Sequence, residues 1–397
     1  MLESKHPAAQ TPSTETLQLY PELPEFPDLD ITEDSVEKVA RRLSGAAGLG
    51  GTDACALKHW LLRFGLASRE LRQAVASFVD WLSNDFPPWA AYRAIMAGRL
   101  LALDESPGIR PVGIGETWRR LFAKTLLLIA GGKAQEACGI YQLCAGLQAG
   151  IKGGIHAIRT LWEQCEAEEE WGFLLVDARN ACNKLNQTVM LWTIQHKWAA
   201  SSRFTFNYYQ HFVILVIQNK SGATTVFILS REGVTQGDPL AMVGYGVGVL
   251  PLIRKLKAEF PQVSQPWYAD DAGAGASFKD ILAFFQRLKA IGPQYGYYPE
   301  ASKSILVVRQ QNLEAAEKHF ASEQFRVTTG ERYLGGYIGA REDQHSWVEG
   351  KTTDWTAAVR ELAKVAVRYP QSAYAGLQKS LQQEWQFLQR VVPEIGD

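Results

Sequence analysis

The stretch Phe173-Leu-Leu-Val-Asp-Ala-Arg-Asn-Ala-Cys-Asn decides how this 397-residue chain is interpreted. Its apolar run ends at Asp177, which predicts a short buried strand with a carboxylate at its end. Farther along, Tyr268-Ala-Asp-Asp places the adjacent acids Asp270 and Asp271 between two short apolar runs, which predicts a turn between strands. Acids rarely stand at the edge of a buried strand unless something pairs with them.

For each of these acids taken singly, an ordinary helix cap or turn residue remains an alternative. The adjacent pair is harder to explain in that way, because like charges repel and a divalent cation is the usual remedy. Carboxylates on neighbouring strands can hold two magnesium ions, the arrangement that serves in-line phosphoryl or nucleotidyl transfer. The residues alone therefore indicate metal-dependent chemistry on phosphates.

Elements of both kinds surround these acids, and their mixture predicts an α+β fold. Strands are predicted at 173–176, 212–218, 224–229, 267–276, 304–308 and 333–338, with a turn at Asn219-Lys-Ser-Gly. Apolar spacings of three and four predict helices over 36–101, including one from Trp89 to Leu100, and over 155–165, 236–260, 278–288 and 354–392.

Composition excludes several classes of protein. With 46% apolar and 21% charged residues the chain is globular. No apolar run approaches the roughly 18 residues of a membrane helix. Five cysteines without a CxxC pair form neither a disulfide frame nor a structural zinc site. Residues 1–35 are rich in Pro, Glu, Thr and Ser and predict a disordered acidic leader; the mildly basic remainder is compatible with a polyanionic partner.

Six short segments of the sequence, taken in order, resemble the motifs of reverse transcriptases, and specifically those of non-LTR retrotransposons. The stretch from Phe173 is similar to the first catalytic motif and Tyr268-Ala-Asp-Asp to the third. The remaining four are Arg110-Pro-Val-Gly-Ile-Gly for the fingers, Gly233-Val-Thr-Gln-Gly-Asp-Pro-Leu for the second motif, Pro299-Glu-Ala-Ser-Lys-Ser for the lysine motif and Tyr333-Leu-Gly-Gly for the primer grip. Any one of these matches would be weak evidence, whereas six matches in the order of the family are specific for it.

The resemblance implies a role for each matching residue. Asp177, Asp270 and Asp271 would form the catalytic acidic cluster, and these three with the Ala178 carbonyl would bind two Mg²⁺ ions, for which Mn²⁺ is a possible substitute. The nucleotide-binding set would be Arg110, Cys182, Gln236, Gly237 and Lys303, and the primer grip would be Tyr333, Leu334, Gly335 and Gly336. Simpler alternatives remain: Arg110 as an exposed arginine, Lys303 as a solvated lysine, and the grip glycines as bulge residues.

One position departs from the family pattern. Reverse transcriptases carry Phe or Tyr five residues after the first aspartate, where the ring rejects the ribose 2′-hydroxyl, and here that residue is Cys182. The smaller side chain would open the pocket, so poor discrimination between dNTP and rNTP is one hypothesis. Drift in a decaying copy of a retroelement is the rival explanation.

The resemblance implies a right-hand polymerase fold with a small antiparallel palm sheet packed on helices. Its segments would be the leader (1–35), a helical N-terminal segment (36–92), fingers and palm (93–341) and the start of a helical thumb (342–397).

The implied activity is RNA-directed DNA polymerisation with an RNA template, a DNA primer and dNTPs, in the nucleus and without a membrane. A catalytically inactive remnant that binds nucleic acid weakly is the alternative, and an RNA-dependent RNA polymerase a more distant one. The chain resembles an isolated polymerase module or a fragment of a longer reading frame, and its oligomeric state stays open.

Overall fold

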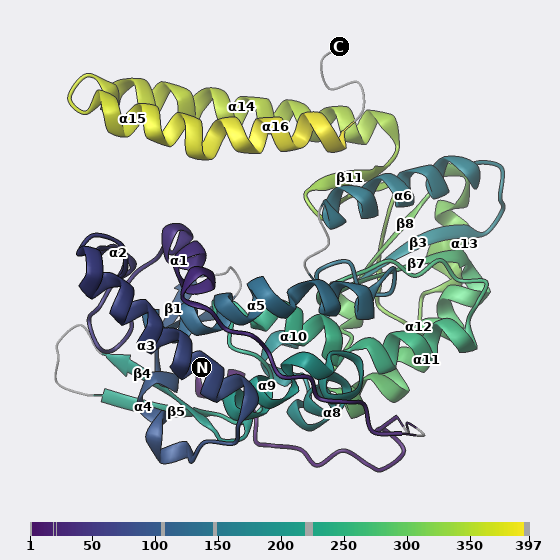
Figure 1. Ribbon diagram of the computed structural model, residues 1–397. Coiled ribbons are helices and arrows are strands. Elements are labelled where there is room, and N and C mark those ends of the chain that lie inside the picture. The colour runs from purple at the N-terminus through teal and green to yellow at the C-terminus, as the bar shows by residue number, and fades with distance from the viewer. Residues whose placement is uncertain are drawn as a thin grey trace. The chain divides into compact units, whose positions relative to one another are not determined.

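The structure is a computed structural model that describes residues 2–18, 20, 22–104, 108–145, 149–218 and 225–392 (Figure 1). The chain forms two compact units. Unit 1 comprises Met1–Leu147, Ala178–Ala258 and Arg287–Tyr298, and unit 2 comprises Gln148–Asp177, Glu259–Gln286 and Pro299–Asp397. These units are delimited differently from the predicted segments, because the chain passes repeatedly from one unit to the other.

Unit 1 contains a four-stranded sheet in the order β2-β1-β4-β5. Its strands are β1 (Gly98–Asp104), β2 (Ile109–Gly115), β4 (Val213–Gln218) and β5 (Thr225–Ser230). Neighbours are antiparallel except for the parallel pair β1 and β4. The β4–β5 pair was predicted, although the turn predicted at Asn219-Lys-Ser-Gly lies outside the described residues.

The prediction of a helix from Trp89 to Leu100 is wrong. A 3-10 turn (Trp89–Ala91) and the short α4 (Arg93–Met96) form there, and the chain then enters β1. All seven residues of β1 pair with β2, so tertiary hydrogen bonding overrides the local pattern. A short apolar run such as 100–103 does not by itself distinguish a strand from a helix.

Unit 1 is otherwise mainly helical, and α1 shows how its helix ends follow capping rules. In α1 the Thr32 side chain accepts the Ser35 N–H, and acids in the first turn and arginines in the last complement the helix dipole. The region predicted as one helix over 236–260 divides at Val249 into α10 and α11. The main helices are α1 (Glu33–Arg42), α2 (Ala54–Leu62), α3 (Gly65–Asn84), α5 (Thr117–Cys138), α7 (Ala181–Lys184), α8 (Gln187–Lys197), α9 (Ser202–Tyr209), α10 (Ala241–Gly248) and α11 (Leu250–Glu259).

The leader, which the sequence predicts to be disordered, lies along unit 1 as an extended strap. Side chains of the body bind its backbone: Asn186 Nδ2 donates to the Gln10 carbonyl at 2.8 Å, and Trp192 Nε1 to the Gln18 carbonyl at 2.9 Å. Leu29 and Ile31 at its end are buried. The strap has no apolar periodicity because its hydrogen bonds go to distant side chains rather than to a regular ladder.

Unit 2 contains a five-stranded sheet in the order β6-β7-β3-β8-β9. The strands are β3 (Trp171–Val176), β6 (Trp267–Tyr268), β7 (Asp271–Ser277), β8 (Ile305–Val308) and β9 (Arg326–Thr328). Four of them are antiparallel as predicted, but β9 runs parallel to β8, so the sheet is mixed. A parallel neighbour requires a crossover, and α13 (Leu313–His319) supplies it.

The core of this sheet forms around β3, in which every residue is buried. A Cβ on Gly273 of β7 would lie 2.6 Å from Phe173 Cζ, so glycine there leaves room for the ring. Phe173 belongs to a hydrophobic cluster with Trp162 of α6 (Gly150–Gln164) and Tyr333. Helix α6 therefore packs on the face of the sheet that carries Phe173 (Figure 1). On the chain beyond β7 lies α12 (Phe278–Ile291).

The C-terminal part of unit 2 is helical, as predicted, but begins earlier than residue 354. It consists of α14 (Arg341–Ala366), α15 (Pro370–Gly376), a π-helical turn (Leu377–Leu381) and α16 (Gln382–Val391). Trp355 and Leu388 belong to one hydrophobic cluster with Ile155 of α6, which attaches these helices to the rest of the unit. Among the described helices, none combines the length and apolarity needed to cross a membrane.

Candidate active site

Asp177 stands directly after β3 and is held by the segment that carries the predicted lysine. The Asp177 N–H donates to Ser304 Oγ at 3.3 Å, and the Asp177 carbonyl accepts the Glu300 N–H at 2.8 Å. Lys303 Nζ lies 4.0 Å from Asp177 Oδ2, with both side chains largely open to solvent. The structure therefore brings together two predicted residues that are far apart in sequence, in an exposed ion pair that contributes little stability of its own.

Asp270 and Asp271 occupy the predicted turn between β6 and β7. Tyr268 pairs with Asp271, which leaves Ala269 and Asp270 as a two-residue turn, with Ala269 in the left-handed region at φ +52°. Because Val176 pairs with Ala272 across antiparallel strands, the next positions along the two strands are Asp177 and Asp271. Such opposed residues are close neighbours on a sheet.

Electrostatics place the three acids in one cluster. Desolvation by surrounding protein, and then the negative charges of Asp270 and Asp177, raise the pKa of Asp271 from 3.8 to about 6. Three carboxylates that disfavour one another's charge favour a proton or a cation. Carboxylate oxygens are the donors that Mg²⁺ prefers. As the side chains stand, however, no group of three or more His, Cys, Asp or Glu in the described residues is arranged to hold a metal ion.

The raised pKa of Asp271 predicts an unusual pH dependence of stability. Because the carboxyl binds its proton more tightly in the folded chain than in the unfolded chain, stability falls as pH rises from 3.8 to about 6. Asp271→Asn should remove this fall and raise Tm at pH 7 by about 2–4 °C. The gain stays small because part of the Asp271 residue remains open to water, which weakens both the desolvation and the repulsion that raise its pKa.

The measurement is Tm from pH 4 to pH 8 without divalent cations. Asp280→Asn is the matched control of opposite sign, because hydrogen bonds from Gln262 and Ser277 lower the pKa of Asp280. That variant should lose stability at neutral pH, where the carboxylate is charged. A Tm profile of Asp271→Asn that follows the wild type would contradict the raised pKa of Asp271.

The predicted primer-grip motif forms a hairpin beside the acids. Strands β10 (Gly330–Tyr333) and β11 (Gly336–Gly339) pair around a two-residue turn. Leu334 and Gly335 both have positive φ, +48° and +82°, as a twisted hairpin requires. For a leucine this conformation is rare, so the hairpin holds Leu334 under strain. The glycines are turn and strand residues rather than bulges.

Tyr333 connects the hairpin to the acidic cluster. Its ring packs edge-on against Phe173 at a centroid distance of 5.9 Å. Its hydroxyl is buried with no hydrogen-bond partner among the described residues. Burial, and then the charge of Asp271, raise the pKa of the Tyr333 phenol. The phenol therefore stays protonated next to the acids.

A cavity of about 170 Å³ in unit 2 joins these features. It gathers two predicted aspartates, the predicted lysine and part of the predicted primer grip. The lining residues are Leu175, Val176, Asp177, Asp271, Ala272, Lys303, Ile305, Arg332, Tyr333 and Leu334. The sequence did not identify Arg332 as a site residue. Its only distinguishing feature there is that it directly precedes the primer-grip motif.

The other predicted residues lie in unit 1. Arg110 is exposed on β2, opposite Leu103 of β1. Three residues later the Gly113 N–H donates to the Gln236 carbonyl at 2.8 Å. Gly237 has φ +99°, and a Cβ there would lie 2.5 Å from the Gly113 carbonyl oxygen. The loop of the second motif therefore docks on the strand that carries Arg110, and this approach requires glycine.

Cys182 lies in α7 against the same loop. Its carbonyl accepts the Val234 N–H at 2.6 Å. Gly233, at φ +72°, comes so close that a Cβ there would lie 2.2 Å from the Cys182 carbonyl oxygen. Ala178, which follows Asp177, is buried. The first and second motifs therefore meet in unit 1 through backbone contacts.

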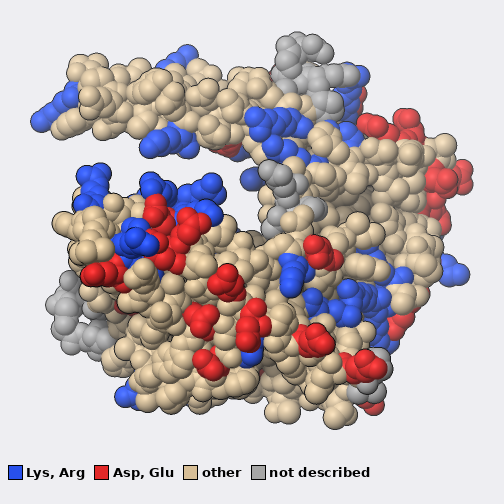
Figure 2. Space-filling view, in the orientation of Figure 1, with Lys and Arg blue, Asp and Glu red and all other residues tan. Residues whose placement is uncertain are grey.

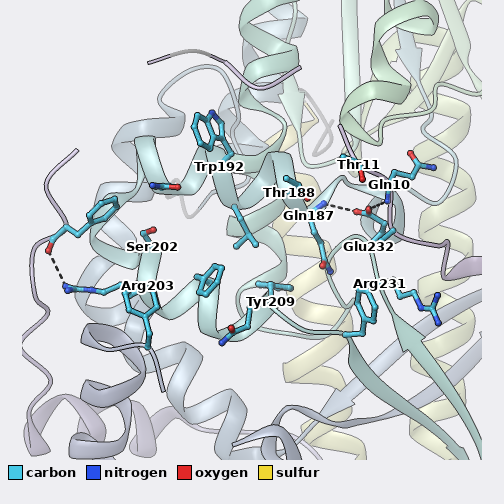
Figure 3. A pocket seen from close by; sticks show the side chains of 18 residues that line it. Gln10, Thr11, Gln187, Thr188, Trp192, Ser202, Arg203, Tyr209, Arg231 and Glu232 are labelled. Atoms are coloured by element: carbon cyan, nitrogen blue, oxygen red, sulfur yellow. Dashed lines mark hydrogen bonds between the residues drawn. The ribbon is translucent and has the colours of Figure 1, made fainter. Parts of the chain in front are cut away.

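A larger cavity, of about 660 Å³, lies in unit 1 between the strap and helices α8 and α9 (Figure 3). The buried Glu232 carboxylate accepts the N–H groups of Gln10 and Gln187, at 2.5 and 2.8 Å. Burial raises the pKa of Glu232 although both hydrogen bonds oppose this. None of the predicted site residues lines this cavity. Its carboxylate is occupied in holding the strap to α8, so we place the candidate chemistry at the smaller cavity.

Charge on the C-terminal helices is uneven. In Figure 2 the visible side of α14–α16 carries mainly Lys and Arg, with few acids. Basic residues on these helices include Arg360, Lys364 and Lys379. A basic helix surface attracts polyanions such as the phosphate backbone of nucleic acids.

Comparisons with protein-family models and with curated proteins each found no match. Among solved structures, the apo telomerase from Candida tropicalis matches with a TM-score of 0.44 and 11% identity, over 62% of this chain and 47% of that one. Telomerase from Candida albicans in complex with a fragment of telomeric RNA matches with a TM-score of 0.44 and 9% identity, over 70% and 50%. The chain thus spans about half the length of these structures.

Proposed function

We propose that the chain is an RNA-directed DNA polymerase of the non-LTR retroelement type, which extends a primer 3′-hydroxyl on an RNA template. The observation that carries the proposal is the cavity of unit 2, where Asp177, Asp271, Lys303 and Tyr333 from separate sequence words share one lining. Carboxylates with a raised pKa that gather in a cavity with a lysine and a strained hairpin are typical of functional sites. The six motif words in family order support the same reaction.

In the proposed reaction, Asp177, Asp270 and Asp271 would hold Mg²⁺, or Mn²⁺ in its place, with the Ala178 carbonyl as a further donor. The bound ions would supply activation of the primer hydroxyl and charge stabilisation at the phosphates. Lys303, beside Asp177, would neutralise or protonate the departing pyrophosphate. Tyr333–Gly336 would support the primer end. In unit 1, Arg110 would contact the triphosphate, and the backbone of Gln236 and Gly237 would line the nucleotide pocket.

The rival proposal is an inactive remnant that retains only nucleic-acid binding. Two observations favour it: Cys182 replaces the family's aromatic residue, and the described acids do not form a ready metal-binding group. The two proposals differ in one measurable property. Oligo(dT) annealed to poly(rA) should be extended with dTTP and Mg²⁺ by an active polymerase and only bound by a remnant. Folded wild type that binds this substrate without extending it would establish the remnant.

Cys182 predicts weak sugar selection. With no ring beneath the nucleotide sugar, wild type should incorporate UTP at a rate comparable to that of dTTP. Cys182→Phe should restore a preference for dTTP by about tenfold or more, because a steric clash penalises the 2′-hydroxyl. The measurement is the ratio of kcat/KM for the two nucleotides. Cys55→Phe, at an exposed cysteine in α2, is the matched control, and unchanged selectivity in Cys182→Phe would refute a steric role.

A further inference from the structure

A buried ion pair stands behind the loop of the second motif. Arg119 of α5 and Asp238 lie in unit 1 with side chains only 2% and 4% exposed, and their Nη2 and Oδ2 atoms are 2.8 Å apart. Asp238 directly follows Gln236 and Gly237. The proposed polymerase mechanism assigns no role to either charge.

Tyr208 of α9 closes this pair into a three-membered network. Arg119 Nε donates to the Tyr208 hydroxyl at 2.7 Å, and that hydroxyl donates to Asp238 Oδ2 at 2.8 Å. The guanidinium also lies over the Tyr208 ring, 4.4 Å from its centroid. Arg119 Nη1 donates to the Met96 carbonyl at 2.6 Å, just before β1. One arginine therefore ties together α5, α9, the entry to β1 and the motif loop.

Asp238 passes this constraint to its neighbours along the chain. Its Oδ1 accepts the Leu240 N–H at 2.9 Å, at the start of α10, and its own N–H donates to the Thr235 carbonyl at 3.0 Å. Gln236 lies inside this closed turn and bonds to Gly113 of β2. The position of Gln236 and Gly237 therefore depends on where Asp238 is held.

Stability alone does not explain such a pair. Removing two charges from water is unfavourable, and a well-packed apolar pair often stabilises a fold as well or better. The buried guanidinium of Arg119 does fix geometry, because its planar donors Nε and Nη1 reach the Tyr208 hydroxyl and the Met96 carbonyl in one arrangement only, while Nη2 meets Asp238 as an ion pair without hydrogen-bond geometry. Tyr209 in the same region keeps a buried hydroxyl without a partner among the described residues.

We propose that Arg119 is a positioning residue that, through Asp238 and Tyr208, holds the Gln236–Gly237 backbone against β2 at the spacing a nucleotide requires. The inference rests on the proposed polymerase function, since it assigns the loop to the nucleotide. It extends that function to three residues that touch no reacting atom.

The first test is steady-state kinetics on oligo(dT)–poly(rA). Arg119→Lys keeps the charge and loses the fork, so KM for dTTP should rise about tenfold while the primer-template KM stays at the wild-type value. Tyr208→Phe keeps the ion pair and loses only the bridging hydroxyl, so the rise should be smaller, about threefold. Arg72→Lys is the matched control: Arg72 is also largely buried, is ion-paired with Glu37 at 3.1 Å in unit 1, and should lose stability without a change in KM.

The second test needs no polymerase activity. Hydrogen exchange at residues 110–116 and 234–240 should be faster in Arg119→Lys and Tyr208→Phe than in wild type, and unchanged in Arg72→Lys. If both variants exchange faster than wild type but wild type never extends a primer, the positioning role is supported and the polymerase is refuted. Unchanged exchange, or unchanged KM for dTTP in folded variants of an active enzyme, would overturn the positioning role and leave the polymerase standing. If Arg119→Lys does not fold, Tyr208→Phe decides by the same criteria.

Discussion

Asp270→Asn should extend oligo(dT) on poly(rA) at about a thousandth of the wild-type rate or less. The substitution removes one negative charge from the acidic cluster and changes almost nothing in shape. Losing metal-assisted stabilisation of the developing phosphate charge costs several kcal/mol, which corresponds to at least this factor in rate. The measurement is single-nucleotide extension by gel at saturating dTTP and Mg²⁺.

The controls for this result separate catalysis from folding. Asp30→Asn removes an exposed acid of the strap and should retain wild-type activity. Asp270→Asn itself should fold with a Tm no lower than that of wild type, because it removes a charge that disfavours ionised Asp271, and it should keep the affinity for the primer-template. A folded Asp270→Asn enzyme with full activity would remove the acidic cluster from the mechanism.

Gly233→Ala should unfold at markedly lower urea concentration, with a loss of about 3 kcal/mol or more in the free energy of unfolding. Gly233 has φ +72°, which is unfavourable for alanine, and the new Cβ would lie 2.2 Å from the Cys182 carbonyl oxygen and 2.4 Å from Asn183 Cα. Both obstacles are backbone atoms, so no side-chain rotation relieves them. Relief requires that the first and second motifs separate, so activity should fall together with stability.

Gly132→Ala provides the matched control. Gly132 lies inside α5, where a Cβ would meet nothing within 4 Å, so alanine should raise the free energy of unfolding by about 0.5–1 kcal/mol. Equal stabilities for the two variants would show that the motif contact at Gly233 yields easily. The measurement is equilibrium urea unfolding followed by circular dichroism.

The sequence predicts the acidic residues of the site more completely than the residues that hold the surrounding loops in place. Asp177 and Asp271 follow or begin apolar strands, and a buried strand with a terminal carboxylate is a local signal. The hairpin at Tyr333 is equally local, because its glycines mark a turn. Arg119 gives no such signal: an arginine in a helix normally faces water, and only the folded chain shows its partners Asp238 and Tyr208.

The sequence fails to predict some strands for the same reason, because their partners are distant along the chain. β1 looks helical until its partner β2 is known, and the three-residue β9 is too short for any periodicity. The strap lacks a pattern because its hydrogen-bond partners are distant side chains, among them those of α8 and α9. Long-range contacts decide these cases, and no window of neighbouring residues contains them.

The interleaving of the two units has a consequence for synthesis on the ribosome. Unit 2 is assembled from three separate stretches of chain, and the pairing of Phe173 with Gly275 joins residues about a hundred positions apart. Asp177 therefore leaves the exit tunnel well before Asp271 is translated, and β3 must wait for both of its neighbours. Such late closure makes folding slow and leaves an apolar strand exposed to other nascent chains. Slower translation before residue 308 would prolong this exposure, and a chaperone that covers β3 during that interval would raise the yield of native protein.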